Sequence, residues 1–385
     1  MASQSRLTSH LSLVVSRWQT RALIIGVIAA IFSLIGLFLN RVQFFHSYLF
    51  AWLFWSGLSF GALVVVMMQN LTGGQWGQAV RGLSTAAYRT LPMMALFFIP
   101  IVLGIHDIYG WANGRNGEAP GYQHKAQYLN VPFFTARAIL YFVVVITITI
   151  LLARWMGRDG PPGRLIGVTT RDASKPHPRR AQRSRPTARV TALSAGGLIA
   201  YVLCMNFAAT DWVMSLDPAW YSTVFVEIFA AGHFLSALAV MTALLAVAAR
   251  NRSLGEAIPT KAFHDLGNML LAFVIFWTYV SFSQFLIIWS GNLPKEISWY
   301  LERSRGGWQW FALGLVLLQF FIPFALLLSR AAKKNRERLG WIAALVALAN
   351  ILAVFWLVAP SFHPEGFYVH WLDFAELIAL GGFWC

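Results

Sequence analysis

The chain consists of long apolar runs separated by mostly short polar connections. A helix needs about 20 apolar residues to cross the roughly 30 Å hydrocarbon core of a bilayer. The runs lack the two-residue alternation of a membrane β-barrel strand, so they predict helices. The predicted spans are 22–39, 44–68, 89–108, 132–154, 190–209, 220–249, 264–289, 307–329, 339–360 and 369–385.

One long connection, at 156–189, interrupts this pattern and divides the chain. We expect an N-terminal segment at 1–21, an N-terminal membrane half at 22–155, the connection itself, and a C-terminal membrane half at 190–385. The last run, 369–385, is short, so we expect a short or tilted helix there.

Composition agrees with a membrane protein. The chain is 58% hydrophobic and only 12% charged, whereas soluble domains are about 25% charged. Lipid accepts only helices and closed barrels, because every backbone polar group must be paired within the protein. The sequence therefore predicts an all-α integral membrane protein with about ten transmembrane helices.

The basic residues indicate orientation. Of 30 Lys and Arg residues, 23 fall on one predicted side, including Arg81 and Arg89 in the second connection. By the positive-inside rule that side is cytoplasmic, and it would hold both chain termini. The net charge of +15 then reflects topology and not nucleic-acid binding. The seven residues expected on the opposite side are Arg41, Arg115, Lys125, Arg137, Lys295, Arg303 and Arg305.

Two predicted loops suggest surface contacts. The 156–189 connection is rich in Gly, Pro and Arg, and we expect it to lie on anionic lipid headgroups or on a partner. The loop at 109–131 carries aromatic, Gly and Pro residues, which suits docking of another protein on the opposite side. In the second span, Gly57-x-x-x-Gly61 indicates close packing of two helix backbones.

Ionisable residues within spans are the candidates for chemistry, because burying a charge in a membrane is costly. Glu227 is predicted about two turns into the sixth span, with His233 deeper on the same helix. Six residues correspond to 240° of rotation, so the two do not share a face. Each side chain either conducts protons or forms a hydrogen bond to a neighbouring helix.

The last run opens with His370, Asp373 and Glu376, which lie within about 120° of one another on a helix. Together with His363 they form a titratable line that enters the membrane from the side opposite the basic residues. Such a line suits a proton half-channel. The alternative is a helix N-terminus that favours acidic residues.

Other polar residues fall at the ends of spans or on one helix face. His106 and Asp107 end the third span, and His264 and Asp265 begin the seventh, where Asp265 is expected to cap the helix. The stripe Trp277, Ser281 and Gln284 suits hydrogen bonding between helices, or lining of a cavity. We include His106, Asp107, His264 and Asp265 in the candidate proton pathway.

The sequence predicts no redox centre of its own. A membrane haem needs paired histidines at matching depth on facing helices, and only His233 is central. There is no CxxC motif, no metal-ligand spacing and no phosphate-binding glycine loop.

Several strings, in order, resemble an NrfD-like family of membrane proteins found in alternative complex III, a bacterial quinol:electron-acceptor oxidoreductase. The resemblance covers residue 20 to the end. The strings are Ser47-Tyr-Leu-Phe-Ala-Trp-Leu-Phe-Trp-Ser-Gly57, Leu71-Thr-Gly-Gly-Gln-Trp-Gly77, Arg89-Thr-Leu-Pro-Met-Met94, Met214-Ser-Leu-Asp-Pro-Ala-Trp220, His264-Asp-Leu-Gly-Asn268 and Ser283-Gln-Phe-Leu-Ile-Ile-Trp289.

This resemblance implies the NrfD-like architecture, also that of polysulfide-reductase membrane subunits, with two four-helix bundles plus two extra helices in the bacterial inner membrane. The implied partners are a sister NrfD-like subunit, an iron–sulfur subunit, multihaem cytochrome c subunits and a terminal oxidase. The complex would oxidise menaquinol or ubiquinol, with haem c and iron–sulfur clusters in the partners. The quinol site is assigned to the sister protein in this family, so quinone-binding residues in this chain stay open.

The leading hypothesis is a membrane subunit of a quinol oxidoreductase complex that anchors its partners and conducts protons. A purely structural anchoring role is the first alternative. A stand-alone secondary transporter is the second, although transporters often pair two broken helices and the prolines within spans, Pro100 and Pro323, predict no matched pair.

Overall fold

The chain is an all-α integral membrane protein. A computed structural model describes residues 2–113, 125–159, 186–251, 255–256 and 258–385. Within these residues there is no strand, and nine helical segments are long and apolar enough to cross a membrane. They are α1 (Ala2–Leu39), α2 (Arg41–Thr72), the broken helix from α3 (Gln75–Tyr88) to α5 (Ile99–Leu103), α8 (Val131–Asp159), α10 (Ala188–Trp212), α11 (Phe225–Ala248), α13 (Thr260–Gly291), the pair α15 (Trp308–Val316) and α16 (Ile322–Leu328), and α18 (Arg336–Phe362). The short helix α6 (Ile105–Ile108) follows the third of these segments.

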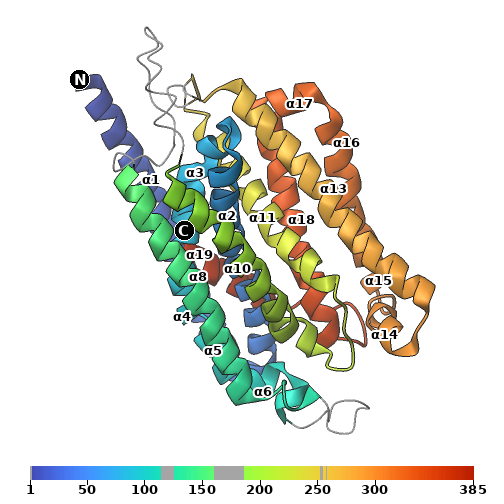
Figure 1. The fold of residues 1–385 in the computed structure, drawn as a ribbon. Helices are drawn as coiled ribbons and strands as arrows, with labels where there is room; N and C mark the ends of the chain where they lie inside the picture. The colour runs from blue at the N-terminus through green and yellow to red at the C-terminus, as the bar shows by residue number, and fades with distance from the viewer. Residues whose placement is uncertain (1, 114–124, 160–185, 252–254, 257) are drawn as a thin grey trace.

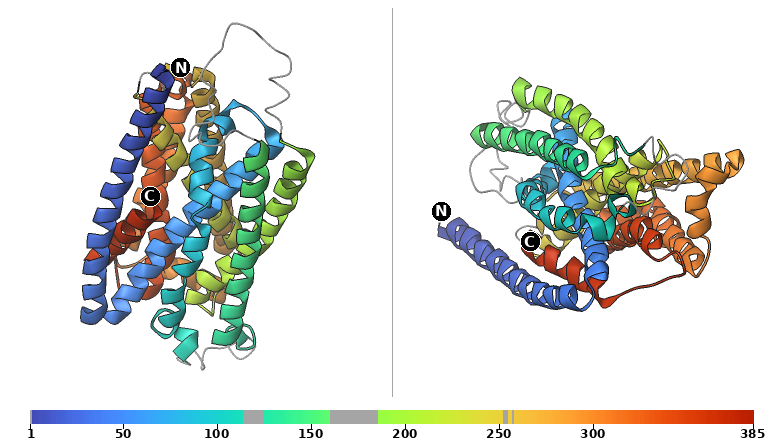
Figure 2. Two further views of the ribbon diagram at one scale, coloured as in Figure 1. Left: turned by 90° about the vertical axis from the view of Figure 1, so that its left-hand side faces the viewer. Right: turned by 90° about the horizontal axis from the view of Figure 1, so that it is seen from below.

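The helices run up and down, so their connections gather at two ends of the bundle (Figure 1). We call the end that carries the N-terminus and α17 (Arg330–Lys334) the basic end. The end that carries α6 and α14 (Pro294–Glu302) is the far end. Helix α2 is central, with 94% of its most apolar stretch buried, and it packs against α1, α10, α11 and α19 (Trp371–Trp384). Figure 2 shows α1 at the edge of the bundle.

The predicted close packing at Gly57 and Gly61 is confirmed. A Cβ atom at Gly61 would overlap the backbone oxygen of His233 in α11, and one at Gly57 would lie 2.6 Å from the His233 ring. Only glycine permits this approach, so the motif joins the centre of α2 to the centre of α11.

The third span begins earlier than predicted. α3 begins at Gln75 and not at 89, so Arg81 and Arg89 lie on the span and not in a connection. The hydroxyl of Thr90 lies 2.7 Å from that of Ser59 in α2, which places this point near the middle of α2. The boundary was missed because α3 is amphipathic, and its polar face dilutes the apolar signal.

Two spans contain irregular turns. Leu317–Phe321 forms a π-helical turn between α15 and α16, and Pro323 follows it without an N–H to donate to the preceding turn. In the third span, α4 (Leu91–Leu96) and α5 (Ile99–Leu103) are separated by a turn just before Pro100. Each proline therefore lies next to an irregular turn in its span. The sequence did not predict that the two spans share this feature.

The tenth run forms a short helix that packs antiparallel to α1. With 14 residues α19 is about 21 Å long, which is less than the bilayer core. A Cβ atom at Gly26 of α1 would lie 2.7 Å from Gly382 Cα, so the two helix backbones touch there. Most of the 156–189 connection and of the 109–131 loop lies outside the described residues, and so do the expectations placed on them.

Candidate functional site

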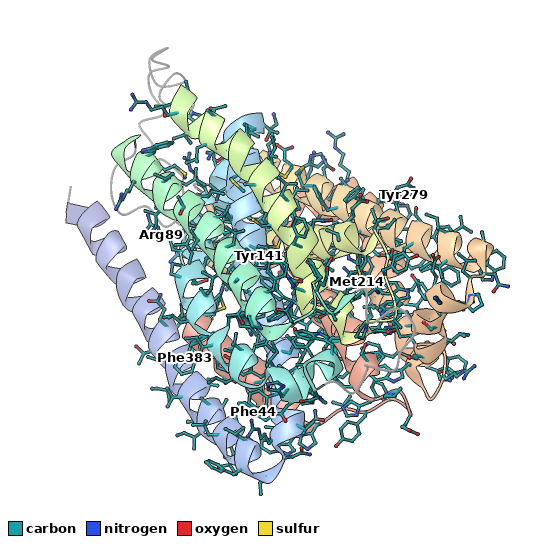
Figure 3. All side chains as sticks on the ribbon, turned by 60° about the horizontal axis from the view of Figure 1, so that its bottom comes forward. Phe44, Arg89, Tyr141, Met214, Tyr279 and Phe383 are labelled. Carbon is teal, nitrogen blue, oxygen red and sulfur yellow. The ribbon has the colours of Figure 1, made fainter. Side chains whose placement is uncertain are left out.

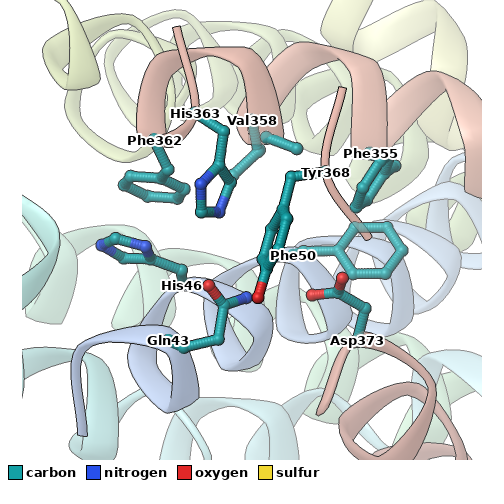
Figure 4. Close-up of a pocket in the computed structure, with 10 residues that line it drawn as sticks. Gln43, His46, Phe50, Phe355, Val358, Phe362, His363, Tyr368 and Asp373 are labelled. Carbon is teal, nitrogen blue, oxygen red and sulfur yellow. The ribbon is translucent and has the colours of Figure 1, made fainter. Parts of the chain in front are cut away.

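Polar residues from three elements meet at the far end around a small pocket (Figure 4). We call the set His46, His363, His370, Asp373 and Glu376, with their hydroxyl partners Ser33 and Ser47, the far-end ladder. Of the ladder, His46, His363 and Asp373 line the pocket, together with Gln43 and Tyr368. About 10 Å³ of it is open to the centre of a water molecule, which is room for about one water.

His46 stands on α2 at the mouth of the ladder. Its Nε2–H donates to the backbone oxygen of Asp107 at 3.2 Å, and its ring stacks on Phe362 with centroids 3.6 Å apart. Its Nδ1 is buried and has no partner among the described residues, so a lone pair is left available. The ring of His363 lies 6.2 Å away, between centroids.

Asp373 both caps α19 and reaches α2. One carboxylate oxygen accepts from the backbone N–H of His370 at 2.8 Å, while His370 Nδ1 accepts from the Leu372 N–H at 3.3 Å. The other oxygen accepts from the Ser47 hydroxyl at 2.5 Å. Asp373 therefore caps α19 with one carboxylate oxygen and binds α2 with the other.

Glu376 lies one turn deeper and is 2% exposed. Its carboxylate accepts a hydrogen bond from Ser33 of α1. No ion pair joins Glu376 or Asp373 to a Lys or Arg in the described part of the chain. The helix-capping alternative does not explain an acid at this depth.

His363 precedes α19 and lies outside the spans. Burial lowers the pKa of its imidazole, while the nearby Asp373 carboxylate raises that pKa and His370 lowers it. The ring centroid of Tyr368 lies 4.6 Å from that of His363. His363 is thus held largely neutral at neutral pH, where a ring nitrogen can accept or donate a proton.

The end of the third span connects to the mouth of the ladder. Asp107 pairs with Arg41 at 2.9 Å, and its backbone oxygen holds His46. His106 Nδ1–H donates to Ala112 O at 3.1 Å and points away from the ladder into its own loop.

His264 and Asp265 lie at the basic end, away from the ladder. The prediction that Asp265 caps the seventh span is wrong, because α13 begins at Thr260 and its cap position is Pro259. The Asp265 carboxylate instead lies 3.7 Å from His264 Nδ1, and both side chains are partly exposed.

The expectation that Glu227 lies two turns into a span is also wrong. α11 begins at Phe225, so Glu227 is in its first turn, and its side chain is exposed with no described partner. His233 is buried as predicted. Its Nδ1 lies 3.1 Å from the Tyr201 hydroxyl, and its buried Nε2 has no partner in the described residues.

Of the polar stripe on α13, Gln284 forms the expected hydrogen bonds to other elements. Gln284 donates to the Tyr300 hydroxyl of α14 at 3.2 Å and accepts from Ser222, before α11, at 3.2 Å. Ser281 donates to Trp277 O within its own helix at 2.8 Å.

A buried ion pair was missed by sequence reasoning. Arg137 of α8 donates through Nε and Nη2 to the two Asp211 oxygens of α10, at 2.9 and 2.8 Å, and Tyr141 adds a third bond at 2.8 Å. The Asp211 side chain is 1% exposed. The sequence signal for this pair was that an arginine and an aspartate lie near the same ends of adjacent spans.

A second missed residue is Arg303, which is 2% exposed at the far end. Its Nη2 donates to Leu357 O and to the Ser361 hydroxyl, both at 3.0 Å, and its guanidinium stacks 3.7 Å above the Trp299 ring. These contacts fix the segment after α14 onto α18.

Among the described residues no group of three or more His, Cys, Asp or Glu side chains is arranged to hold a metal ion. Comparison of the sequence with protein-family models and with curated proteins gave no significant match. The chain is a multi-pass membrane protein.

Proposed function

We propose that this chain is a membrane component of a bacterial quinol oxidoreductase of the alternative complex III type, and that its far-end ladder carries protons. The sequence strings support the complex. The ladder supports proton movement, because Asp373 and Glu376 are buried without a cationic partner and are reached from the far end through three histidines. That uncompensated pair of acids is the observation that carries the proposal.

The steps follow from the contacts. A proton from the far end binds His46 Nδ1 or His363, and the pocket that these rings share with Asp373 has room for about one water molecule to relay it. Asp373 and Glu376 are three residues apart on one helix face, and Ser47 and Ser33 hold their oxygens with hydroxyls that can also accept protons. Electron transfer itself belongs to haem and iron–sulfur groups in the partner subunits.

The experiment replaces Glu376 by Gln in the native complex, reconstituted in vesicles with a pH dye. We expect quinol oxidation to persist and proton movement per electron to fall, because the amide keeps the Ser33 contact but cannot exchange a proton. The matched control is Glu227→Gln, which removes an exposed acid of α11. Equal proton yield in Glu376→Gln and wild type would reject the pathway.

The complex itself is tested by a mild-detergent pull-down of the tagged chain from its native membrane. Co-purification with multihaem cytochrome and iron–sulfur subunits, identified by mass and by haem and iron content, is the expected result. Recovery of the chain alone, free of haem and iron, would contradict the complex assignment.

A secondary transporter is the second candidate, favoured by the irregular turns near Pro100 and Pro323. Broken helices line substrate sites in many transporters. A transporter would be recovered alone in the pull-down and would move a solute in vesicles. A chain with a purely anchoring role would instead lose assembly, not proton yield, in Glu376→Gln.

A further inference from the structure

The basic end carries a concentration of positive charge on one short helix. α17 is five residues long and places Arg330, Lys333 and Lys334 within about 100° of one another. Like charges at this spacing repel. No ion pair joins any of the three to an acid in the described part of the chain. An anion supplied from outside the chain would relieve that repulsion.

Lys333 is the unusual member, because it is 8% exposed. Its stem lies across Gly267 of α13, where a Cβ atom would be 2.7 Å from Lys333 Cγ. Its ammonium donates to Asn268 Oδ1 at 2.8 Å. An ammonium has three N–H donors, so a buried cation with one neutral acceptor is under-paired.

The surroundings of α17 place it at the level of lipid headgroups. Leu326 and Leu328 of α16, 44% and 59% exposed, lie on the membrane side of α17. Trp341 of α18 is 67% exposed, and tryptophan is enriched at membrane interfaces. Arg330 and Lys334, at the two ends of α17, are exposed. Figure 3 draws the side chains on the ribbon.

We propose that the cationic surface formed by Arg330, Lys333 and Lys334 of α17 binds the phosphate of an anionic phospholipid. The phosphate oxygens accept the free donors of Lys333 and pair with Arg330 and Lys334, and the acyl chains lie along the apolar surface of α16. Inorganic phosphate has the same charge chemistry but no chains to bury, so lipid and free anion can be told apart.

The test uses the full chain in a neutral detergent and native mass spectrometry, titrated with phosphatidylglycerol, phosphatidylcholine or inorganic phosphate. We expect retained phosphatidylglycerol, little phosphatidylcholine, and no displacement by inorganic phosphate. Arg330→Ala with Lys334→Ala should weaken phosphatidylglycerol binding about 30-fold, or about fivefold for each cation. Both residues are exposed, so unchanged thermal unfolding by circular dichroism verifies folding.

Two controls make the result specific. Arg154→Ala with Arg189→Ala removes two exposed cations from the basic end on α8 and α10, and should leave binding unchanged. The variant Arg330→Lys with Lys334→Arg keeps both charges and should bind phosphatidylglycerol as well as the wild-type chain does. Equal loss in the Arg154 and Arg189 variant would show diffuse attraction and overturn the site. Equal binding of phosphatidylcholine, or full competition by inorganic phosphate, would also overturn the lipid proposal.

Discussion

Two groups of buried polar side chains near the far end differ in how their charge is matched. Between α8 and α10, Asp211 faces a guanidinium through two hydrogen bonds and a tyrosine through a third. Between α1, α2 and α19, the carboxylates of Asp373 and Glu376 accept hydrogen bonds from serine hydroxyls and a backbone N–H. The first group is closed by a fixed cation, whereas in the described residues no Lys or Arg pairs with the acids of the second, which is what the proposed proton pathway requires. Burial alone therefore does not mark an acid as functional.

The largest effect is expected at the closed pair. Asp211→Asn leaves Arg137 buried without a counter-charge, which should lower the free energy of unfolding by about 3–5 kcal/mol. Thermal unfolding in detergent measures this loss. Arg137→Met with Asp211→Leu removes both charges and should recover most of it, because apolar replacements of a buried pair are often neutral. Full stability of Asp211→Asn would show that the pair is not holding the bundle.

A smaller effect is expected when a ladder hydroxyl is removed. Ser33→Ala takes away the donor to Glu376 and keeps the acid, so proton yield should fall less than in Glu376→Gln. We expect the rate of proton transfer to drop about 2- to 10-fold, which corresponds to the net free energy of one hydrogen bond. A pH dye in reconstituted vesicles measures it. A loss as large as that of Glu376→Gln would mean that the Ser33 hydroxyl is as necessary for the step as the acid.

The smallest effect is a pH dependence at His363. Burial depresses the pKa of its imidazole in the folded chain, so the unfolded chain binds more protons as pH falls below about 6.5. The contribution of His363 to stability is present at higher pH and is lost as pH falls through that window. The charged and titratable groups around it are His46, Tyr368, His370 and Asp373.

His363→Asn should therefore flatten the loss of thermal stability on acidification, as measured by melting curves across pH. An unchanged slope in this variant would place the acid sensitivity elsewhere.

The sequence predicted the spans well because hydropathy over 20 residues is a local property. It placed the start of the third span too late, because α3 pairs an apolar face with Arg81 and other polar residues. The titratable line on α19 was predictable from its three-residue spacing. Its partners Ser33 and Ser47 were not, because they lie more than 320 residues away in the chain.

Other misses have the same cause. Arg137 and Asp211 each sit near a span end, and only the packing of α8 on α10 reveals that they meet. Glu227 was a candidate for the proton pathway because burying a charge is costly. In the structure α11 begins only at Phe225, so Glu227 lies in its first turn, and its side chain is exposed. The depth of a residue depends on where its helix begins, and the direction in which its side chain faces depends on tertiary contacts.

Infrared difference spectroscopy of the full chain between acidic and neutral pH would separate the two groups of acids most directly. Protonated carboxyl groups give a distinct C=O stretch, so each titrating acid can be assigned by its variant. We predict that Asp373→Asn and Glu376→Gln each remove part of the pH-dependent carboxyl band, and that Asp211→Asn removes none. A band that survives both ladder variants, or that disappears with Asp211→Asn, would contradict proton exchange at the far-end ladder.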